Sequence, residues 1–206
     1  MLAKTHLAVG YASALLITQP STARELVLCL GFSTIGSLIS DIDATTSESK
    51  KELSKVIAAV VTGTFAIFAG DYFLNTDIIS RFNSNENLMK LIFGFFILLT
   101  ICIFGERQPH RTFMHSIPGL AITTGCFSFF LPQAAEYIAI SMASHILIDL
   151  LNKKKVRIFY PKKKPRIGLG ICYSDGLVNS VLFLAAGALS IGLTALTVTR
   201  IVHRYI

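Results

Sequence analysis

Seven long apolar segments divide the chain, and they constrain its fold more strongly than any other feature of the sequence. The segments cover residues 5–18, 25–40, 55–74, 88–105, 116–131, 134–151 and 176–199. A helix needs about 20 apolar residues to cross a hydrocarbon core of about 30 Å, so the first two segments could instead form a re-entrant pair. The pattern predicts an all-α fold, a multi-pass transmembrane helical bundle of about six to seven spans.

The composition favours a membrane protein over a soluble one. Only 15% of the residues are charged, against about 25% in a typical soluble domain, and the mean hydropathy is +0.61. The loops are too short for a separate soluble domain, so we expect residues 1–206 to form a single integral membrane domain whose main partner is the lipid bilayer. The net charge of +7 then reflects loops that face an anionic leaflet, and no nucleic acid is expected as a partner.

Basic residues are divided unequally between the two sides that seven spans would create. Fourteen of the 19 Lys and Arg residues fall on the side of the N-terminus and five on the other, and eight of the fourteen lie in the loop 152–175. The positive-inside rule therefore predicts a cytoplasmic N-terminus in a bacterial inner membrane. One alternative stays open: Lys4 followed by the apolar run 7–17 also fits a signal peptide, which would be removed together with His6.

Ionisable residues stand at the ends of the apolar segments, on the predicted cytoplasmic side. The stretch "SMASHILIDLL" places His145 and Asp149 four residues apart, which puts both side chains on one face of a helix. An ionisable group at membrane depth costs a few kcal/mol unless it finds a partner. A hydrogen bond between two helices would satisfy this pair alone. The same side, however, carries a larger set of polar residues: His6, Asp41, Asp43, His110, Arg111 and His115.

Four histidines and three aspartates are therefore expected at one end of the bundle. Imidazole and carboxylate are ligands of divalent Zn, Mn, Fe and Ni. We predict a site for one or two divalent ions, with Zn or Mn as the best candidates, built from His6, Asp41, Asp43, His110, His115, His145 and Asp149. Seven residues exceed one tetrahedral site, so they suit either two ions that share a carboxylate or one ion with separate acid–base and supporting groups.

Five sequence elements, in their order, resemble one known family. They are "THLAVG" near the start, "SDID" after the second segment, "HRTFMHS" before the fifth, and "SHILIDLLN" with "VRIFYP" after the sixth. This order is similar to that of the YdjM-type (LexA-regulated) membrane-bound metal-dependent hydrolases, which are small multi-pass bacterial proteins. The resemblance implies an all-helical fold. It also implies metal or catalytic roles for the seven residues above and for Arg111.

The resulting expectation is a membrane-embedded hydrolase of an ester or phosphoester. Asp149 or Asp43 would transfer a proton, and the planar fork of Arg111 would bind a phosphate oxygen. The loop "NKKKVRIFYPKKKPR" would attract anionic head groups, so an anionic or phosphorylated lipid-like substrate at the cytoplasmic membrane face is favoured. Two alternatives remain: a non-catalytic metal-binding membrane protein, and a small transporter or channel in which Asp71 would extend a polar path.

Overall fold

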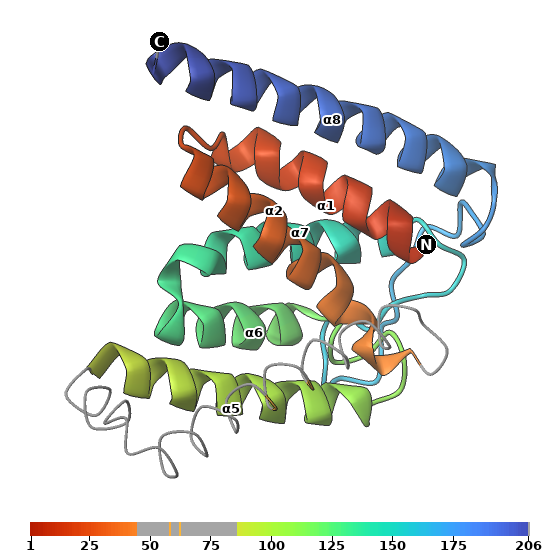
Figure 1. Ribbon diagram of the computed structural model, residues 1–206. Helices are drawn as coiled ribbons and strands as arrows, with labels where there is room; N and C mark the ends of the chain where they lie inside the picture. The colour runs from red at the N-terminus through yellow and green to blue at the C-terminus, as the bar shows by residue number, and fades with distance from the viewer. Residues whose placement is uncertain (45–57, 59–61, 63–85, 206) are drawn as a thin grey trace.

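The computed structural model describes residues 1–44, 58, 62 and 86–205, and the regular structure of these residues is helical, without strands (Figure 1). Among the described residues there are six α-helices and one short 3-10 helix: α1 (Ala3–Thr18), α2 (Ala23–Ile39), η1 (Ser40–Asp43), α5 (Glu86–Glu106), α6 (Ile117–Phe130), α7 (Pro132–Asp149) and α8 (Leu177–Tyr205). The prediction of an all-α class is therefore confirmed for this part of the chain.

Polar caps mark the start of two helices and a proline marks the start of a third. At the start of α2, the hydroxyl of Thr22 accepts a hydrogen bond from the N–H of Glu25 at 3.2 Å. At the start of α6, the hydroxyl of Ser116 accepts one from the N–H of Gly119 at 3.1 Å. Helix α7 begins with Pro132, where the missing N–H costs nothing. Such caps satisfy backbone N–H groups that the first turn of a helix leaves without partners.

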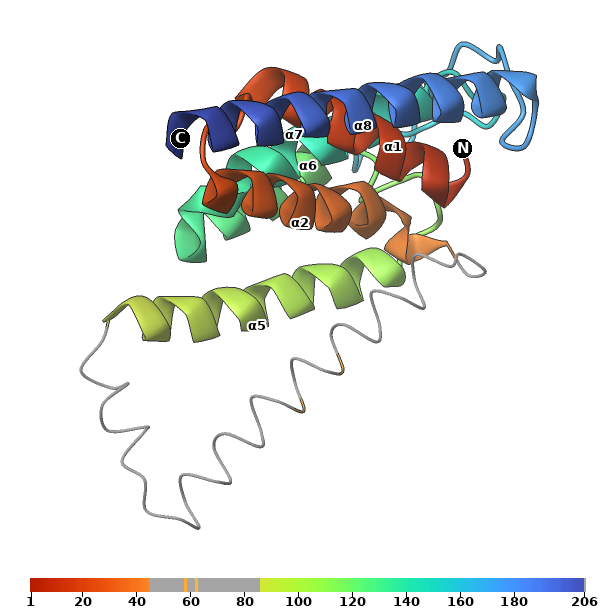
Figure 2. The ribbon, with the colours of Figure 1, turned by 45° about the horizontal axis from the view of Figure 1, so that its top comes forward.

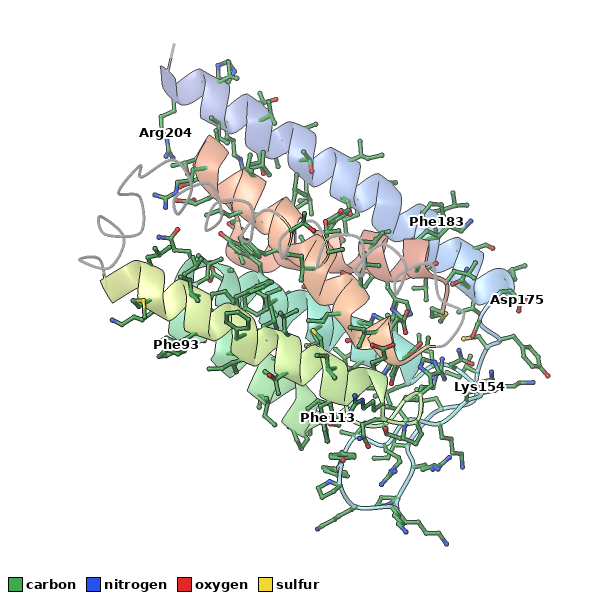
Figure 3. All side chains as sticks on the ribbon, turned by 60° about the horizontal axis from the view of Figure 1, so that its bottom comes forward. Phe93, Phe113, Lys154, Asp175, Phe183 and Arg204 are labelled. Carbon is green, nitrogen blue, oxygen red and sulfur yellow. The ribbon has the colours of Figure 1, made fainter. Side chains whose placement is uncertain are left out.

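Helices α1, α2 and α7 form the centre of the molecule, because each packs against the other two. On one side α8 covers α1, and on the other α6 covers α7 and α5 covers α6 (Figures 1 and 2). Side chains fill the spaces between these helices (Figure 3). Large apolar side chains on the outer helices are nevertheless exposed, among them Phe93 and Phe96 on α5 and Leu184 and Ile191 on α8. Apolar surface of this extent is suited to contact with lipid.

Three helical stretches of the described chain are long and apolar enough to cross a membrane: Ala23–Asp43, Leu88–Glu106 and Leu177–Arg204. The prediction of six to seven spans is not confirmed. Helices α1 and α6 have only 16 and 14 residues, fewer than the about 20 that a span requires. Helix α7 has 18 residues, but its polar side chains reduce its mean hydropathy. The expected segment 55–74 lies outside the described residues, apart from two single positions.

The close packing of α2 against α7 depends on a residue without a side chain. A Cβ atom built on Gly36 would overlap the hydroxyl of Ser141 and lie 2.9 Å from the carbonyl oxygen of Ile138. The corresponding position at Gly31, also on α2, has no atom within 4 Å. The distance between the two helices therefore leaves no room for a methyl group at position 36, and position 31 offers a control on the same helix.

We expect the substitution Gly36→Ala to destabilise the protein, whereas Gly31→Ala should be neutral or slightly stabilising. An extra methyl group in a packed interface costs about 1–3 kcal/mol, while alanine is the better helix former by up to about 1 kcal/mol. Thermal unfolding of both variants in detergent, followed by circular dichroism, measures the difference. Equal midpoints would show that α2 and α7 do not pack as closely as described.

Candidate metal centre

The seven predicted ligand residues come together at one end of the helical bundle. Four parts of the chain supply them: the start of α1, the 3-10 helix η1, the connection between α5 and α6, and the last turns of α7 (Figure 1). Their ligand atoms form two groups, and within each group the atoms lie no more than 4.8 Å apart. The first group is Asp41, Asp43, His110 and His115, and the second is His6, His145 and Asp149.

Asp41 belongs to the first group and also lies next to the second. Its Oδ1 atom is 3.5 Å from Nε2 of His115 and 3.5 Å from Nε2 of His145. The same Nε2 atom of His115 is 3.4 Å from Oδ2 of Asp149. His6 completes the arrangement, because its Nε2 atom is 3.5 Å from Oδ1 of Asp149 and its ring stacks on that of His145 with 3.5 Å between centroids. These five side chains form one continuous cluster, called the central cluster below.

The spacing in the central cluster suits metal coordination better than direct hydrogen bonds. Nitrogen–oxygen separations of 3.4 and 3.5 Å are long for hydrogen bonds. Two ligands held about 2.1 Å from a tetrahedral ion lie about 3.4 Å from each other. Both ring nitrogens of His6 and His115, and Nε2 of His145, are buried without a hydrogen-bond partner among the described residues. Buried polar atoms are rarely left in that state, so these residues could hold a metal ion.

A hydrogen bond at the second ring nitrogen of His145 fixes which ring nitrogen faces the cluster. Its Nδ1 atom lies 2.7 Å from the carbonyl oxygen of Ser37. A carbonyl can only accept, so Nδ1 carries the hydrogen and Nε2 keeps its lone pair in the neutral ring. Metal-binding histidines commonly donate their other N–H in this way. Nothing in the sequence singles out Ser37, because its contribution is a backbone carbonyl in the last turn of α2, where helices leave carbonyls without partners.

Asp43 is engaged mainly by groups outside the central cluster. Its Oδ1 atom accepts a hydrogen bond from Nδ1 of His110 at 2.7 Å, and its Oδ2 atom accepts one from the backbone N–H of Arg111 at 3.1 Å. Nδ1 of His115 is also near, at 3.6 Å from Oδ2. The carboxylate of Asp43 is fully buried, whereas the side chain of His110 is 38% exposed. Asp43 therefore orients His110 at the border between the buried cluster and solvent.

Arg111 joins the central cluster to the loop that follows α7. Its guanidinium group donates to Asp149 at 3.2 Å and also to the carbonyl oxygen of Lys154. Its own carbonyl oxygen accepts a hydrogen bond from the N–H of Arg157 at 3.0 Å. The backbone of Arg111 has φ 64°, a left-handed conformation that costs residues with a side chain about 1–2 kcal/mol. Such a conformation persists where the surrounding contacts over-determine it, which is common at functional sites.

The electrostatic field of the site favours positive charge at its centre. His115 is fully buried, and burial alone would lower the pKa of its imidazole. The three neighbouring carboxylates outweigh burial and hold that pKa well above its ordinary value. The same carboxylates would attract a divalent cation, which competes with protons for the ring nitrogens. The negative charge of the carboxylates and the set of donor atoms therefore both suit a divalent cation.

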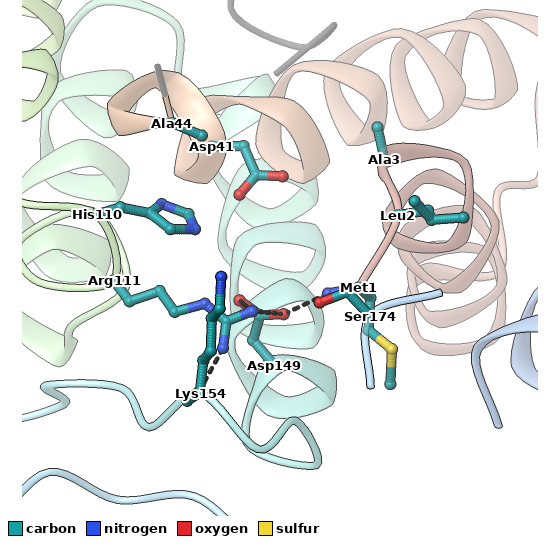
Figure 4. Close-up of a pocket in the computed structure, with 10 residues that line it drawn as sticks. All are labelled: Met1, Leu2, Ala3, Asp41, Ala44, His110, Arg111, Asp149, Lys154 and Ser174. Carbon is teal, nitrogen blue, oxygen red and sulfur yellow. Dashed lines mark hydrogen bonds and ion pairs between the residues drawn. The ribbon is translucent and has the colours of Figure 1, made fainter. Parts of the chain in front are cut away.

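A cavity of about 370 Å³ adjoins the central cluster (Figure 4). Ten residues line it: Met1, Leu2, Ala3, Asp41, Ala44, His110, Arg111, Asp149, Lys154 and Ser174. Within it the amino group of Met1 donates to Oδ1 of Asp149 at 2.9 Å. Lys154 and Ser174 were not among the predicted site residues, and the run of lysines around Lys154 was the one signal that pointed to this part of the chain. The cavity makes part of the cluster accessible to a small molecule.

Two other ionisable residues lie outside this set of predicted ligands. Asp175 is exposed in the turn before α8, and His203 is exposed in the last turn of that helix. Asp71, on which a transport path would depend, lies outside the described residues.

Comparison with known proteins identifies the family. The family described as YdjM inner membrane protein matches residues 1–204. No curated protein and no solved structure matches the chain. The description of the family and the three apolar helices both support a location in a membrane. Since the match covers nearly the whole sequence, it confirms the resemblance found in the motifs, and the chain belongs to the YdjM inner membrane protein family.

Proposed function

We propose that the protein is a membrane-embedded, metal-dependent hydrolase that cleaves an ester or phosphoester of a lipid-like substrate at the cytoplasmic membrane face. One observation carries this proposal: histidine nitrogens that are buried, and that have no hydrogen-bond partner within the described part of the chain, lie among carboxylates next to a cavity. A site of this composition suits zinc or manganese, because both ions accept imidazole and carboxylate ligands.

Two ions fit the ligand set better than one. The candidate ligands fall into two groups, and each group offers at least three ligand atoms close together. The Oδ1 atom of Asp41 is 3.5 Å from a histidine nitrogen of each group, so its carboxylate is placed to be shared. Paired ions of this kind are used by phosphatases and nucleases to stabilise both the attacking and the leaving oxygen.

A divalent ion bound in this site would supply Lewis acidity and a nucleophile at neutral pH. The residues of the chain would orient the substrate and move protons. Asp43 accepts a hydrogen bond from Nδ1 of His110, which leaves the lone pair of Nε2 on that partly exposed ring available to accept a proton from an attacking water. Asp149 is the second candidate for proton transfer, because its carboxylate lines the cavity and contacts both Arg111 and His115.

Basic groups in the cavity favour a phosphoester over a carboxylic ester. Arg111 and Lys154 both line the cavity, and Nε of the buried Arg111 has no hydrogen-bond partner in the described part of the chain. The planar fork of a guanidinium group binds phosphate oxygens in a defined orientation. Arg111 would therefore position the phosphate group of a substrate while it remains in contact with Asp149.

Non-catalytic metal binding is the main alternative. A structural zinc site is closed by four protein ligands, and the complete burial of His115 and His145 would suit such a site. The cavity that reaches Asp41 and Asp149 favours catalysis instead, because a structural site needs no access. A small transporter or channel is a further alternative, and it would depend on Asp71, for which the described chain offers no evidence.

We expect His115→Ala and His145→Ala each to weaken metal binding by at least about 100-fold, since loss of merely supporting groups already costs about 10–100-fold. His203→Ala is the matched control, because that histidine is exposed at the far end of α8. Elemental analysis of the purified protein gives the identity and number of ions, and titration with a competing chelator gives the affinity. Unchanged metal binding in both cluster variants would refute the metal centre.

We expect Asp149→Asn to lower the rate of phosphoester hydrolysis by about 10²–10⁴-fold, because the amide carries no negative charge for a metal or a proton. If Asp149 only joined helices by hydrogen bonds, asparagine would keep them and activity would be nearly unchanged. Nitrophenol release from bis(4-nitrophenyl) phosphate and phosphate release from a short-chain phosphatidic acid measure the rate. Asp175→Asn, an exposed aspartate outside the site, should retain full activity.

We expect the loop 152–175 and the metal centre to face the cytoplasm, as the basic residues indicate. The four native cysteines are buried free thiols, so a cysteine introduced at an exposed position reacts selectively. In whole cells an impermeant maleimide should label Arg204→Cys, at the end of α8, but not Lys163→Cys. The opposite result would reverse the orientation without affecting the metal centre.

A further inference from the structure

The chain exposes a row of apolar side chains between the basic loop and α8. Leu169, Ile171, Tyr173 and Leu177 are 68%, 61%, 62% and 80% exposed, respectively. They occur at alternate positions up to Tyr173, and Cys172 between them is buried. These four residues are called the apolar row below. Asp175, between Tyr173 and Leu177, is exposed as well. Scattered exposed leucines need no explanation, but four strongly exposed apolar side chains within nine residues indicate an interaction surface.

The apolar row is held in place by backbone hydrogen bonds. The N–H groups of Leu169 and Ile171 donate to the carbonyl oxygens of Leu150 and Leu151 at 2.6 and 2.9 Å, directly after α7. The N–H of Lys153 donates to the carbonyl oxygen of Cys172 at 3.0 Å. The segment is thus fastened to the end of α7, and its backbone could not turn these side chains inward without breaking those bonds.

The surroundings of the apolar row indicate what covers it. Leu177 begins α8, whose stretch Leu177–Arg204 is long and apolar enough to cross a membrane, so the row continues directly into a candidate span. Lysines and arginines precede the row in the chain, and Nζ of Lys153 lies 3.9 Å from the ring centroid of Tyr173. Apolar side chains with a tyrosine and basic groups at their border are the arrangement found where a protein meets the head groups of a bilayer.

We propose that the apolar row is inserted into the interfacial region of the bilayer leaflet nearest the metal centre, where anionic lipid head groups contact the neighbouring basic residues. Ser174, which lies within the segment of the row, and Lys154, in the basic loop before it, both line the cavity beside the central cluster (Figure 4). The inserted row therefore places the cavity at the level of the head groups. This surface is independent of any reaction at the metal centre, since it requires only the bilayer.

The protein contains no tryptophan, so single introduced tryptophans report on depth without background. Leu169→Trp and Ile171→Trp change exposed positions that accept a larger side chain. Each variant is reconstituted into vesicles of phosphatidylcholine and phosphatidylglycerol in equal parts, with bromine atoms either near the carbonyl end or near the methyl end of the acyl chains. Ile191→Trp on α8, 73% exposed, is the reference for a deep position, and Lys163→Trp in the basic loop is the reference for the aqueous side.

We expect carbonyl-end bromines to quench the two tryptophans of the apolar row at least about twofold more than methyl-end bromines do, with emission at shorter wavelength than that of Lys163→Trp. Ile191→Trp should show the reverse preference. Quenching by aqueous iodide instead of bromolipids would overturn the proposal by placing the row in water. Protection from both quenchers would overturn it as well, because the row would then be covered by protein.

Discussion

The structure depends on one electrostatic constraint: several ionisable side chains are buried at one end of an apolar bundle, and none of them can be buried alone. Asp149 shows how the constraint is met, since its carboxylate contacts Arg111, His115 and His6. Removing one partner from a buried charge costs about 3–5 kcal/mol, because the remaining charge is left uncompensated. Four parts of the chain must therefore meet at one place, and this requirement limits how the helices can be arranged.

Two irregular parts of the backbone bring ionisable groups to the cluster. The chain changes from α-helix to 3-10 helix at Ser40, which brings Asp41 and Asp43 to the cluster and leaves the carbonyl of Ser37 for His145. Further along, the left-handed backbone of Arg111 directs its N–H to Asp43 and its side chain to Asp149. In both places an irregular backbone positions the charged groups, while the regular helices around them carry the apolar side chains.

The sequence was sufficient to predict the helical class and that these ionisable residues would lie at one end of the bundle, while their roles as ligands stay a prediction. Ionisable residues are conspicuous in apolar segments, and counting segments assigns them to one side, as with His6 and His145. Two aspects were not predictable. The division of roles between Asp43, which orients His110, and Asp41, which lies between two histidines, depends on side-chain directions that spacing does not determine. The number of spans depends on how short helices such as α1 and α6 lie in the bilayer, and hydropathy reports only length and composition.

The distribution of the cluster along the chain has a consequence for biosynthesis. His6 and Asp41 emerge from the ribosome long before His145 and Asp149, and chains are made at about 5–20 residues per second. For several seconds, therefore, the first two helices carry ionisable groups whose partners do not yet exist. Completion of α7 would then draw them together, so that assembly of the bundle and completion of the site are the same event.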